Sequence, residues 1–269
     1  MNPMPQLETH LKQLRLSGIL DSLMVRNQQA IQSKLAYTDF LALLIQDEVA
    51  RRDQRQFGQR LRKAQISGDK TLERFDYAHS PSVNQSLIAE LATCRFITEY
   101  APILIAGPTG TGKSHLIQAL CHCALRAGHN VLFITHSRLL ALLHAAKATN
   151  AYDRKLQQLA KIDVMAIDDF GLRPMHSPQD EDFHELIALR YETKTTLVTS
   201  NLAFAEWGAA FSNKLMGAAT IDRLRDAAYL IELDGDTRRK PRAISVITTA
   251  SVKTVKTGIQ TNTQIKNET

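Results

Sequence analysis

Residues 103–116 of this 269-residue chain read ILIAGPTGTGKSHL, and this segment is the strongest indication of its fold class. Four apolar residues precede a glycine-rich segment that matches the pattern G-x-x-x-x-G-K-[S/T] at every fixed position, and a helical pattern follows at once. Glycines allow such a loop to curl so that successive backbone N–H groups point inward and hold phosphate groups. The order of strand, loop and helix therefore predicts a site for the phosphates of a nucleoside triphosphate at the start of a helix.

The residues of this loop have expected roles at a site for ATP and Mg²⁺. The Lys113 side chain is expected to reach the β- and γ-phosphates as a mobile charge, and the Ser114 hydroxyl is expected to ligate the magnesium ion. The residues expected to bind the nucleotide are Gly107, Pro108, Thr109, Gly110, Thr111, Gly112, Lys113, Ser114 and His115.

Two acidic residues follow a second apolar run, VMAI at residues 164–167. A strand over that run would end at the edge of the sheet where the phosphates bind, so Asp168 is expected to hold Mg²⁺ directly or through a water molecule. Asp169 is then the candidate base that orients the attacking water. A strand that ends in a solvated Asp-Asp turn is the alternative explanation, and it applies more readily to Asp169 than to Asp168.

A third apolar run ends in Thr199-Ser200-Asn201, which places Asn201 beside the acidic pair. Its amide can hydrogen-bond the γ-phosphate or the attacking water. A turn-forming asparagine after a strand is an equally common explanation.

Short apolar runs alternate with longer helical patterns from about residue 76, which is typical of βα units and a mostly parallel sheet. The expected strands cover residues 103–106, 131–134, 164–167, 196–199 and 229–233, so we predict an α/β fold with a three-layer α/β/α core. Apolar residues at helical spacing before the core predict a small N-terminal helical domain. We expect this domain at residues 1–68, the nucleotide-binding domain at 69–242 and a flexible basic tail at 243–269. A C-terminal helical lid is expected to be reduced or absent.

Basic residues are concentrated near the two ends of the chain, whose net charge is +6. Residues 76–236 carry more acidic than basic residues, so a polyanion outside the nucleotide site would meet the ends first. We therefore expect largely non-sequence-specific contacts with DNA phosphates. Solvated helix faces explain the same charge equally well. The expected DNA-binding residues are Arg51, Arg52, Arg55, Arg60, Arg62 and Lys63, together with Ser137, Arg138 and Lys147 after the second expected strand.

The remaining composition is that of an ordinary globular protein, with 44% hydrophobic residues. The longest apolar runs are far shorter than the ~20 residues that cross a bilayer, and no leader pattern opens the sequence. Cys94, Cys121 and Cys123 lack the spacing of a zinc site or a disulfide framework. We expect a cytoplasmic protein without membrane contact.

Taken together, these motifs make the sequence similar to the IstB-type transposition helper ATPases, relatives of the DnaC-type helicase loaders in the initiator branch of the AAA+ superfamily. The resemblance covers roughly residues 7–239 and is far more diagnostic than the phosphate-binding loop alone. It is carried by KTLERFD at 70–76, GPTGTGKSHL at 107–116, IDDFG at 167–171, RYE at 190–192, TSNL at 199–202, Trp207 and IDRL at 221–224.

The resemblance implies an ATP-hydrolysing homo-oligomer that assembles on DNA and assists a partner transposase. It makes Asn201 the sensor of the γ-phosphate. It makes Arg223 the arginine finger that reaches the ATP of a neighbouring subunit, with Arg225 as the fallback, whereas a surface arginine on an amphipathic helix is the alternative. It also places Phe75 near the adenine, although a core phenylalanine that joins the domains explains that residue as well.

The chain departs from the family pattern in two places. Thr109 stands where proline is usual, at a variable position where the change is expected to matter little. Residues 235–239 read GDTRR where a G-x-S-aromatic-R run is usual, so the roles of Arg238 and Arg239 stay open.

Other functions share parts of this pattern. A DnaC-type helicase loader has the same catalytic residues and differs in its partner, although the N-terminal pattern is more similar to the transposition branch. A P-loop kinase for a small molecule belongs to a different class, and Asn201 and Arg223 argue against it, as does the lack of an arginine-dense lid segment. A GTPase is weaker still because the sequence has no N-K-x-D motif.

Overall fold

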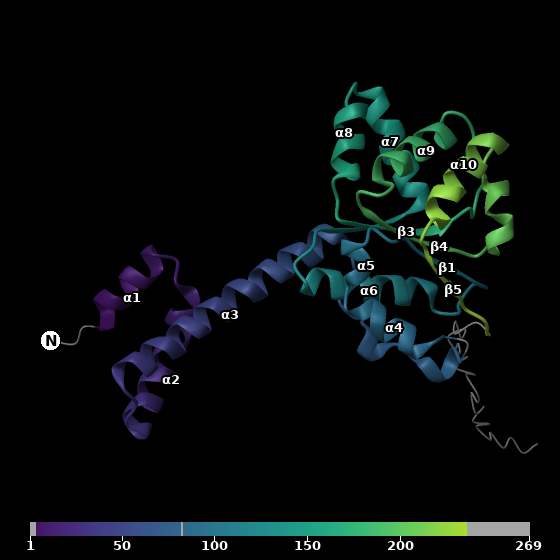
Figure 1. Cartoon of the computed structure of the whole chain (residues 1–269). Helices are drawn as coiled ribbons and strands as arrows, with labels where there is room; N and C mark the ends of the chain where they lie inside the picture. Colours follow the sequence, from purple (N-terminus) through teal and green to yellow (C-terminus); the bar gives the residue numbers. More distant parts are fainter. Residues whose placement is uncertain (1–3, 82, 236–269) are drawn as a thin grey trace, which may run out of the picture. The chain divides into compact units, whose positions relative to one another are not determined.

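A computed structural model describes residues 4–81 and 83–235 (Figure 1). Its centre is a sheet of five strands in which every strand pair is parallel. The strand order across the sheet is β2-β3-β4-β1-β5. The strands are β1 (Ile103–Ala106), β2 (Val131–Thr135), β3 (Val164–Phe170), β4 (Thr195–Ser200) and β5 (Tyr229–Glu232). All five predicted strands are therefore confirmed, and β3 continues three residues beyond its predicted end.

Alternate strand residues face two separate hydrophobic clusters. Ile103 and Ile105 of β1 pack in the first cluster, whereas Leu104 packs in the second, because successive side chains of a strand point to opposite faces. Strand β3 divides in the same way, with Ala166 in the first cluster and Met165 in the second. The sheet is thus buried on both faces, as a parallel sheet requires.

Helices cover both faces and complete the predicted three layers (Figure 1). The first face carries α4 (Gln85–Ala92), α5 (Arg95–Thr98) and α6 (Lys113–Arg126). The second face carries α7 (His136–Ala148), α8 (Tyr152–Ala160), α9 (Gln179–Arg190), the short 3-10 helix η3 (Phe204–Ala210) and α10 (Lys214–Arg225). The predicted fold class is confirmed.

The N-terminal region consists of α1 (Met4–Gln13), α2 (Ser17–Ser33) and α3 (Tyr37–Ala64), as the helical spacing predicts. A small cluster of Leu11, Ile19, Leu23 and Leu44 joins these helices. The buried carboxylate of Glu48 accepts hydrogen bonds from the backbone N–H groups of Gly18 and Ile19 at the start of α2. These bonds satisfy N–H groups that have no partner within the helix.

Helix α3 is continuous over 28 residues and joins two hydrophobic clusters. Its first turns pack on α2, and Phe57, Leu61 and Ala64 in its last turns pack in the first cluster of the sheet domain. The helix ends at Ala64, and Gln65 directly after it has a φ of 59°, which lies in the left-handed region. The segment that follows contains the short 3-10 helices η1 (Leu72–Arg74) and η2 (Tyr77–His79). The domain boundary at residue 68 stays a prediction.

Residues 236–269 lie outside the described part of the chain. The expected basic tail, any lid segment beyond Gly235, and Arg238 and Arg239 fall in that range. Among the described residues, no helix combines the length and the apolar character needed to cross a membrane.

Candidate nucleotide-binding site

The loop predicted to bind phosphates connects β1 to α6 at the carboxyl edge of the sheet. Gly107, its first residue, has a φ of +145°, and a Cβ atom there would overlap the carbonyl oxygen of Leu233. Gly112, directly before α6, has a φ of +103°, and a Cβ atom there would approach the Phe75 ring to 3.3 Å. These two positions therefore favour glycine, which allows the chain to turn tightly at the N-terminal end of α6.

Lys113 and Thr111 are both held inside this loop. Lys113 is only 5% exposed, and its ammonium group donates to the carbonyl oxygens of Gly107 and Pro108, each at 2.7 Å. The Thr111 hydroxyl donates to the Pro108 carbonyl at 3.0 Å, and the Thr111 carbonyl accepts a hydrogen bond from Ser80 at 3.1 Å. The lysine charge and the N-terminal end of α6 thus lie together, and both favour a bound anion.

Ser114 and Asp168, the two predicted metal ligands, are in direct contact. The Ser114 hydroxyl donates to Oδ1 of Asp168 at 3.0 Å, and the Thr199 hydroxyl donates to the same oxygen. Asp168 is 5% exposed, and Thr199 is fully buried on β4. The sequence motifs do not predict Thr199 as a site residue, although a hydroxyl at the end of a buried strand two residues before Asn201 is a signal for it.

A β-bulge places both acidic residues at the edge of the sheet. Ile167 pairs with Val198 and Phe170 pairs with Ser200, so two acids on β3 oppose one residue on β4. Asp169 has a φ of +58°, and its backbone N–H donates to the Thr199 hydroxyl at 3.2 Å. The prediction that the strand ends at residue 167 is therefore wrong. The bulge interrupts the alternation of side chains, so the two consecutive acids need not face opposite sides of the sheet.

These residues fit ATP with Mg²⁺. Magnesium is usually held by one or two protein oxygens and completes its octahedral shell with water and phosphate oxygens. Ser114 and Asp168 offer two adjacent oxygen ligands. In residues 4–81 and 83–235, no group of three or more His, Cys, Asp and Glu side chains could hold a metal ion. Ser114 and Asp168 would supply two ligands of a magnesium ion at this edge, and water and phosphate oxygens would supply the others.

Asn201 lies next to the first residues of the loop. It lines a pocket together with Gly107 and Pro108; the other lining residues are Ala106, Ala203, Glu206, Glu232 and Asp234. The sheet explains this placement, because Ala106 at the end of β1 pairs with Ser200 at the end of β4. The role of Asn201 as a γ-phosphate sensor stays a prediction.

Phe75 and His115 contact each other beside the loop. Their ring centroids lie 5.5 Å apart, with the rings edge-on, and Phe75 packs in the same way on Tyr77 at 5.0 Å. His115 Nε2 lies 2.9 Å from the Thr71 carbonyl oxygen, so α6 is joined to the segment before the sheet. Phe75 is 5% exposed and belongs to the first core cluster, which accounts for it as a core residue. Its contact with adenine stays a prediction.

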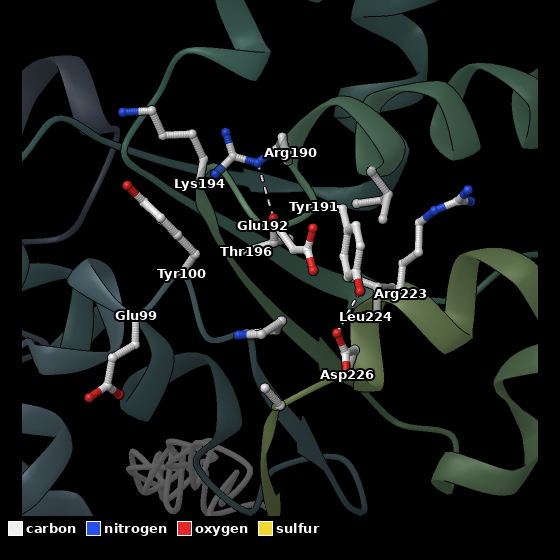
Figure 2. Close-up of a pocket in the computed structure, with 13 residues that line it drawn as sticks. Glu99, Tyr100, Arg190, Tyr191, Glu192, Lys194, Thr196, Arg223, Leu224 and Asp226 are labelled. Carbon is white, nitrogen blue, oxygen red and sulfur yellow. Dashed lines mark hydrogen bonds between the residues drawn. The ribbon is translucent and has the colours of Figure 1, made fainter.

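Arg223 lies at the opposite edge of the sheet from the loop. It sits near the end of α10, which leads from the carboxyl end of β4 back to the amino end of β5. It lines a pocket with Pro102, which precedes β1. The same pocket includes Thr196 near the start of β4 (Figure 2). Figure 2 shows its guanidinium group directed away from Arg190. The four residues of β1 separate the two edges of the sheet by about 13 Å. Arg223 is therefore distant from the phosphate-binding loop of its own chain.

Arg190 in the same pocket is accounted for by packing. It is 1% exposed, and its guanidinium group donates to the Thr196 hydroxyl and to the carbonyl oxygens of Leu159, Ala160, Ile162 and Thr195. Burial lowers the pKa of Arg190 to about 9. The following Tyr191 donates its hydroxyl hydrogen to Asp226 at 2.6 Å (Figure 2). The RYE motif therefore joins α9 to the start of β4 and to the end of α10.

The predicted DNA-binding arginines of α3 do not share one face. Arg51, Arg55 and Arg62 lie within about 40° of one another around the helix, and all three are exposed. Arg51 forms an ion pair with Asp21 at 3.0 Å, but both side chains are about half exposed, so the pair is weak and exchangeable.

The other basic residues of α3 have contacts within the chain. Arg52 donates to the buried Glu48 carboxylate at 2.7 Å and so supports the N-terminal helices. Arg60 and Lys63 line a pocket with Leu125 and Val131 of the sheet domain. None of these placements tests DNA binding, which stays a prediction for all six residues.

The second group of predicted DNA-binding residues lies on α7. Ser137 and Arg138 are exposed in its first turn, at the same edge of the sheet as the phosphate-binding loop. Lys147 is near the other end of the helix, where it forms an ion pair with Asp182 at 2.5 Å and lies over the Tyr152 ring. Lys147 therefore has a structural partner that DNA would have to displace.

Comparison with known proteins agrees with the resemblance seen in the motifs. The family model described as IstB-like ATP binding protein matches residues 9–245. A Pseudomonas aeruginosa protein named as an ATP-binding protein of insertion sequence IS21 is 36% identical over 239 residues, which cover 89% of each chain. A Mycobacterium tuberculosis protein named for ATP binding in an insertion sequence is 34% identical over 236 residues, covering 87% of this chain and 94% of the relative.

Solved structures share the fold. The DnaC helicase loader matches with a TM-score of 0.51 and 20% identity, covering 57% of this chain and 90% of that one. DnaA from Aquifex aeolicus matches with a TM-score of 0.54 and 20% identity, covering 64% of this chain and 52% of that one. At this identity the likeness concerns the fold alone. From the extent of the family match and the identity to its relatives, the chain belongs to the IstB-like ATP-binding proteins.

Proposed function

We propose that this protein hydrolyses ATP with Mg²⁺ at the edge of the sheet where the phosphate-binding loop meets β3. The loop and Lys113 bind the triphosphate, and Ser114 and Asp168 hold the metal ion, which neutralises charge on the phosphate oxygens. Asp169 orients the attacking water, and Asn201 contacts the γ-phosphate. The contact between Ser114 and Asp168 carries this proposal, because it joins two oxygen ligands from residues 54 apart in the sequence at the N-terminal end of α6.

The complete site is shared between subunits of a homo-oligomer. Lys113, Ser114 and Asp168 approach the nucleotide from one chain, whereas Arg223 of that chain is at the other edge of its sheet. A guanidinium group from a neighbour therefore completes the charge compensation at the γ-phosphate, a contribution worth ~10³-fold or more in rate. Arg225, which is exposed two residues further along, is the fallback for this role.

DNA is the polyanion that the oligomer binds. The exposed basic face of α3, formed by Arg51, Arg55 and Arg62, supports contacts with the phosphate backbone, which carry no sequence information. Ser137 and Arg138, at the phosphate-binding edge of the sheet, extend this binding next to the nucleotide site.

The partner of the assembled protein is a transposase. The relatives reported above are named as insertion-sequence proteins, which supports a role in DNA transposition. ATP binding drives assembly on DNA, and hydrolysis releases the assembly in the cytoplasm. A helicase loader uses the same site with a different partner, and the likeness to DnaC concerns the fold alone.

Subunit mixing tests the shared site. Arg223→Ala is expected to lose ATPase activity while its own loop still binds ATP, because the missing group acts on a neighbour. Lys113→Ala is expected to be inactive because its own loop no longer binds ATP productively, although its Arg223 is intact. Mixing the two inactive variants is therefore expected to restore part of the activity at interfaces that join an intact loop to an intact arginine. A small-molecule kinase or a monomeric ATPase shows no such rescue and no steep dependence of rate on protein concentration, and that result would overturn the proposal.

Salt dependence tests the DNA face. Each phosphate contact contributes about 0.9 to the slope of log affinity against log salt concentration. Replacing Arg51, Arg55 and Arg62 together by glutamine is therefore expected to lower that slope by about 3 on duplex DNA. The matched control is Arg154→Gln, an exposed arginine on α8. An unchanged slope in the triple variant would remove this face from the proposal.

A further inference from the structure

His184 on α9 connects Arg223 to the interior of the second helical layer. Its Nε2 atom lies 3.4 Å from Nη1 of Arg223, and its Nδ1 atom lies 2.7 Å from the hydroxyl oxygen of Thr220. The Thr220 hydroxyl in turn donates to the Met216 carbonyl at 2.8 Å, four residues earlier on α10. Thr220 is fully buried, and His184 and Arg223 are half-buried. These contacts form a continuous chain from the α10 backbone to the guanidinium group.

The direction of each hydrogen bond follows from the hydrogens available. A hydroxyl has one hydrogen, and the Thr220 hydroxyl donates it to the Met216 carbonyl, which can only accept. The Thr220 oxygen must therefore accept a hydrogen bond from Nδ1–H of His184. In a neutral imidazole with its hydrogen on Nδ1, Nε2 carries a lone pair, and that lone pair accepts from the Arg223 guanidinium.

A neutral acceptor suits an arginine that must act on another molecule. A carboxylate partner would neutralise the guanidinium and compete with phosphate for it. An imidazole nitrogen restricts the orientation of the long side chain but leaves its positive charge available.

We propose that His184 is a positioning residue, which fixes the Arg223 guanidinium for the γ-phosphate of the ATP in the neighbouring subunit. This inference rests on the function proposed for Arg223. Thr220 supports the same positioning role, because its hydroxyl selects the imidazole tautomer whose Nε2 atom can accept a hydrogen bond from Arg223.

Four variants test this role: His184→Leu, which removes the acceptor; His184→Gln, which keeps an amide oxygen near the position of Nε2; Thr220→Val, which removes the hydroxyl; and His144→Leu, a control on an exposed histidine of α7. His184→Leu is expected to lower kcat by ~10- to 100-fold, since misplacement of a catalytic group by about 1 Å costs up to that much. The affinity of its own loop for ATP should stay within about twofold of wild type, because the loop lies at the other edge.

The conservative variant and the mixing assay separate positioning from general damage. His184→Gln is expected to recover most of the activity, and His184→Leu mixed with Lys113→Ala is expected to recover part of it. The double variant His184→Leu/Arg223→Ala should be no slower than Arg223→Ala alone, because both changes remove the same interaction. If His184→Leu fails to fold, Thr220→Val and His184→Gln are measured in the same mixing assay, and their kcat values decide whether the imidazole positions Arg223.

Arg223→Ala measured in parallel separates this inference from the proposed function. Full activity of Arg223→Ala would overturn the arginine finger and the inference with it. In a second outcome, Arg223→Ala is inactive and is rescued by mixing, but His184→Leu and Thr220→Val both keep the wild-type kcat. This outcome would overturn the positioning role alone. Additive losses in the double variant would likewise show that His184 acts separately from Arg223.

Discussion

His136 is expected to make the stability of the fold depend on pH. It is 3% exposed at the start of α7, its ring lies 5.0 Å from that of Phe170 and 5.1 Å from that of Phe183, and its Nε2 atom has no hydrogen-bond partner among the described residues. These surroundings disfavour the charged form, so burial lowers the pKa of His136 from 6.5 to about 4. The folded protein therefore holds this imidazole neutral.

The size and sign of the effect follow from that difference in pKa. Between pH 6.5 and 4 the unfolded chain binds a proton at this residue and the folded chain does not, so acidification favours unfolding. The contribution of neutral His136 is fully present above pH 6.5, is lost as the pH falls towards 4, and levels off below it. One pKa unit corresponds to about 1.4 kcal/mol, so the loss amounts to about 3 kcal/mol.

Urea unfolding followed by circular dichroism at pH 7.5, 6, 5 and 4.5 measures this loss. The side chain of His136→Leu has a similar volume and does not titrate. Between pH 7.5 and 4.5, the free energy of unfolding of this variant should fall less than that of wild type by about 2.5 kcal/mol, which is most of the full loss. His144→Leu, on the exposed side of the same helix, is the matched control and should keep the wild-type dependence. Parallel curves for wild type and His136→Leu would refute the reasoning.

The remaining predictions concern the nucleotide site. Lys113→Ala and Asp168→Ala are each expected to give a folded protein that lacks ATPase activity, because each removes a charge at the phosphates or the metal ion rather than core packing; near-normal turnover in either variant would contradict the site. Asp169→Asn is expected to bind ATP normally, measured with a fluorescent analogue, and to hydrolyse it slowly, so that the assembled state persists. Loss of nucleotide binding in Asp169→Asn would instead identify Asp169 as a metal ligand.

Local patterns in the sequence were sufficient for the fold class and for one side of the site. Strand β1 was predicted with its exact bounds, because a short apolar run before a glycine-rich loop has few other interpretations. Ser114 and Asp168 were predicted as metal ligands, and the structure brings them into contact. That contact could be anticipated because parallel strands present their carboxyl ends at one edge of a sheet, whichever strands are neighbours.

Tertiary structure decided which residues share a face or an edge. The pairing of β3 with β4 places Thr199 against Asp168 and contains the bulge at Asp169, and neither follows from the spacing of residues along one strand. The packing of α9 on α10 brings His184 to Arg223, 39 residues apart in the sequence, at the edge away from the loop.

The basic run of α3 shows the same limit. Its basic residues are close together in the sequence, but Arg52 donates to the buried Glu48 and Arg60 lines a pocket with the sheet domain. One exposed face of the helix then carries Arg51, Arg55 and Arg62. Motifs and periodicity in the sequence are enough to predict which elements form and which of them are candidates for phosphate binding, since these signals act over a few residues. Only the packed structure decided which side chains meet, because those contacts depend on strand order and helix orientation between distant segments.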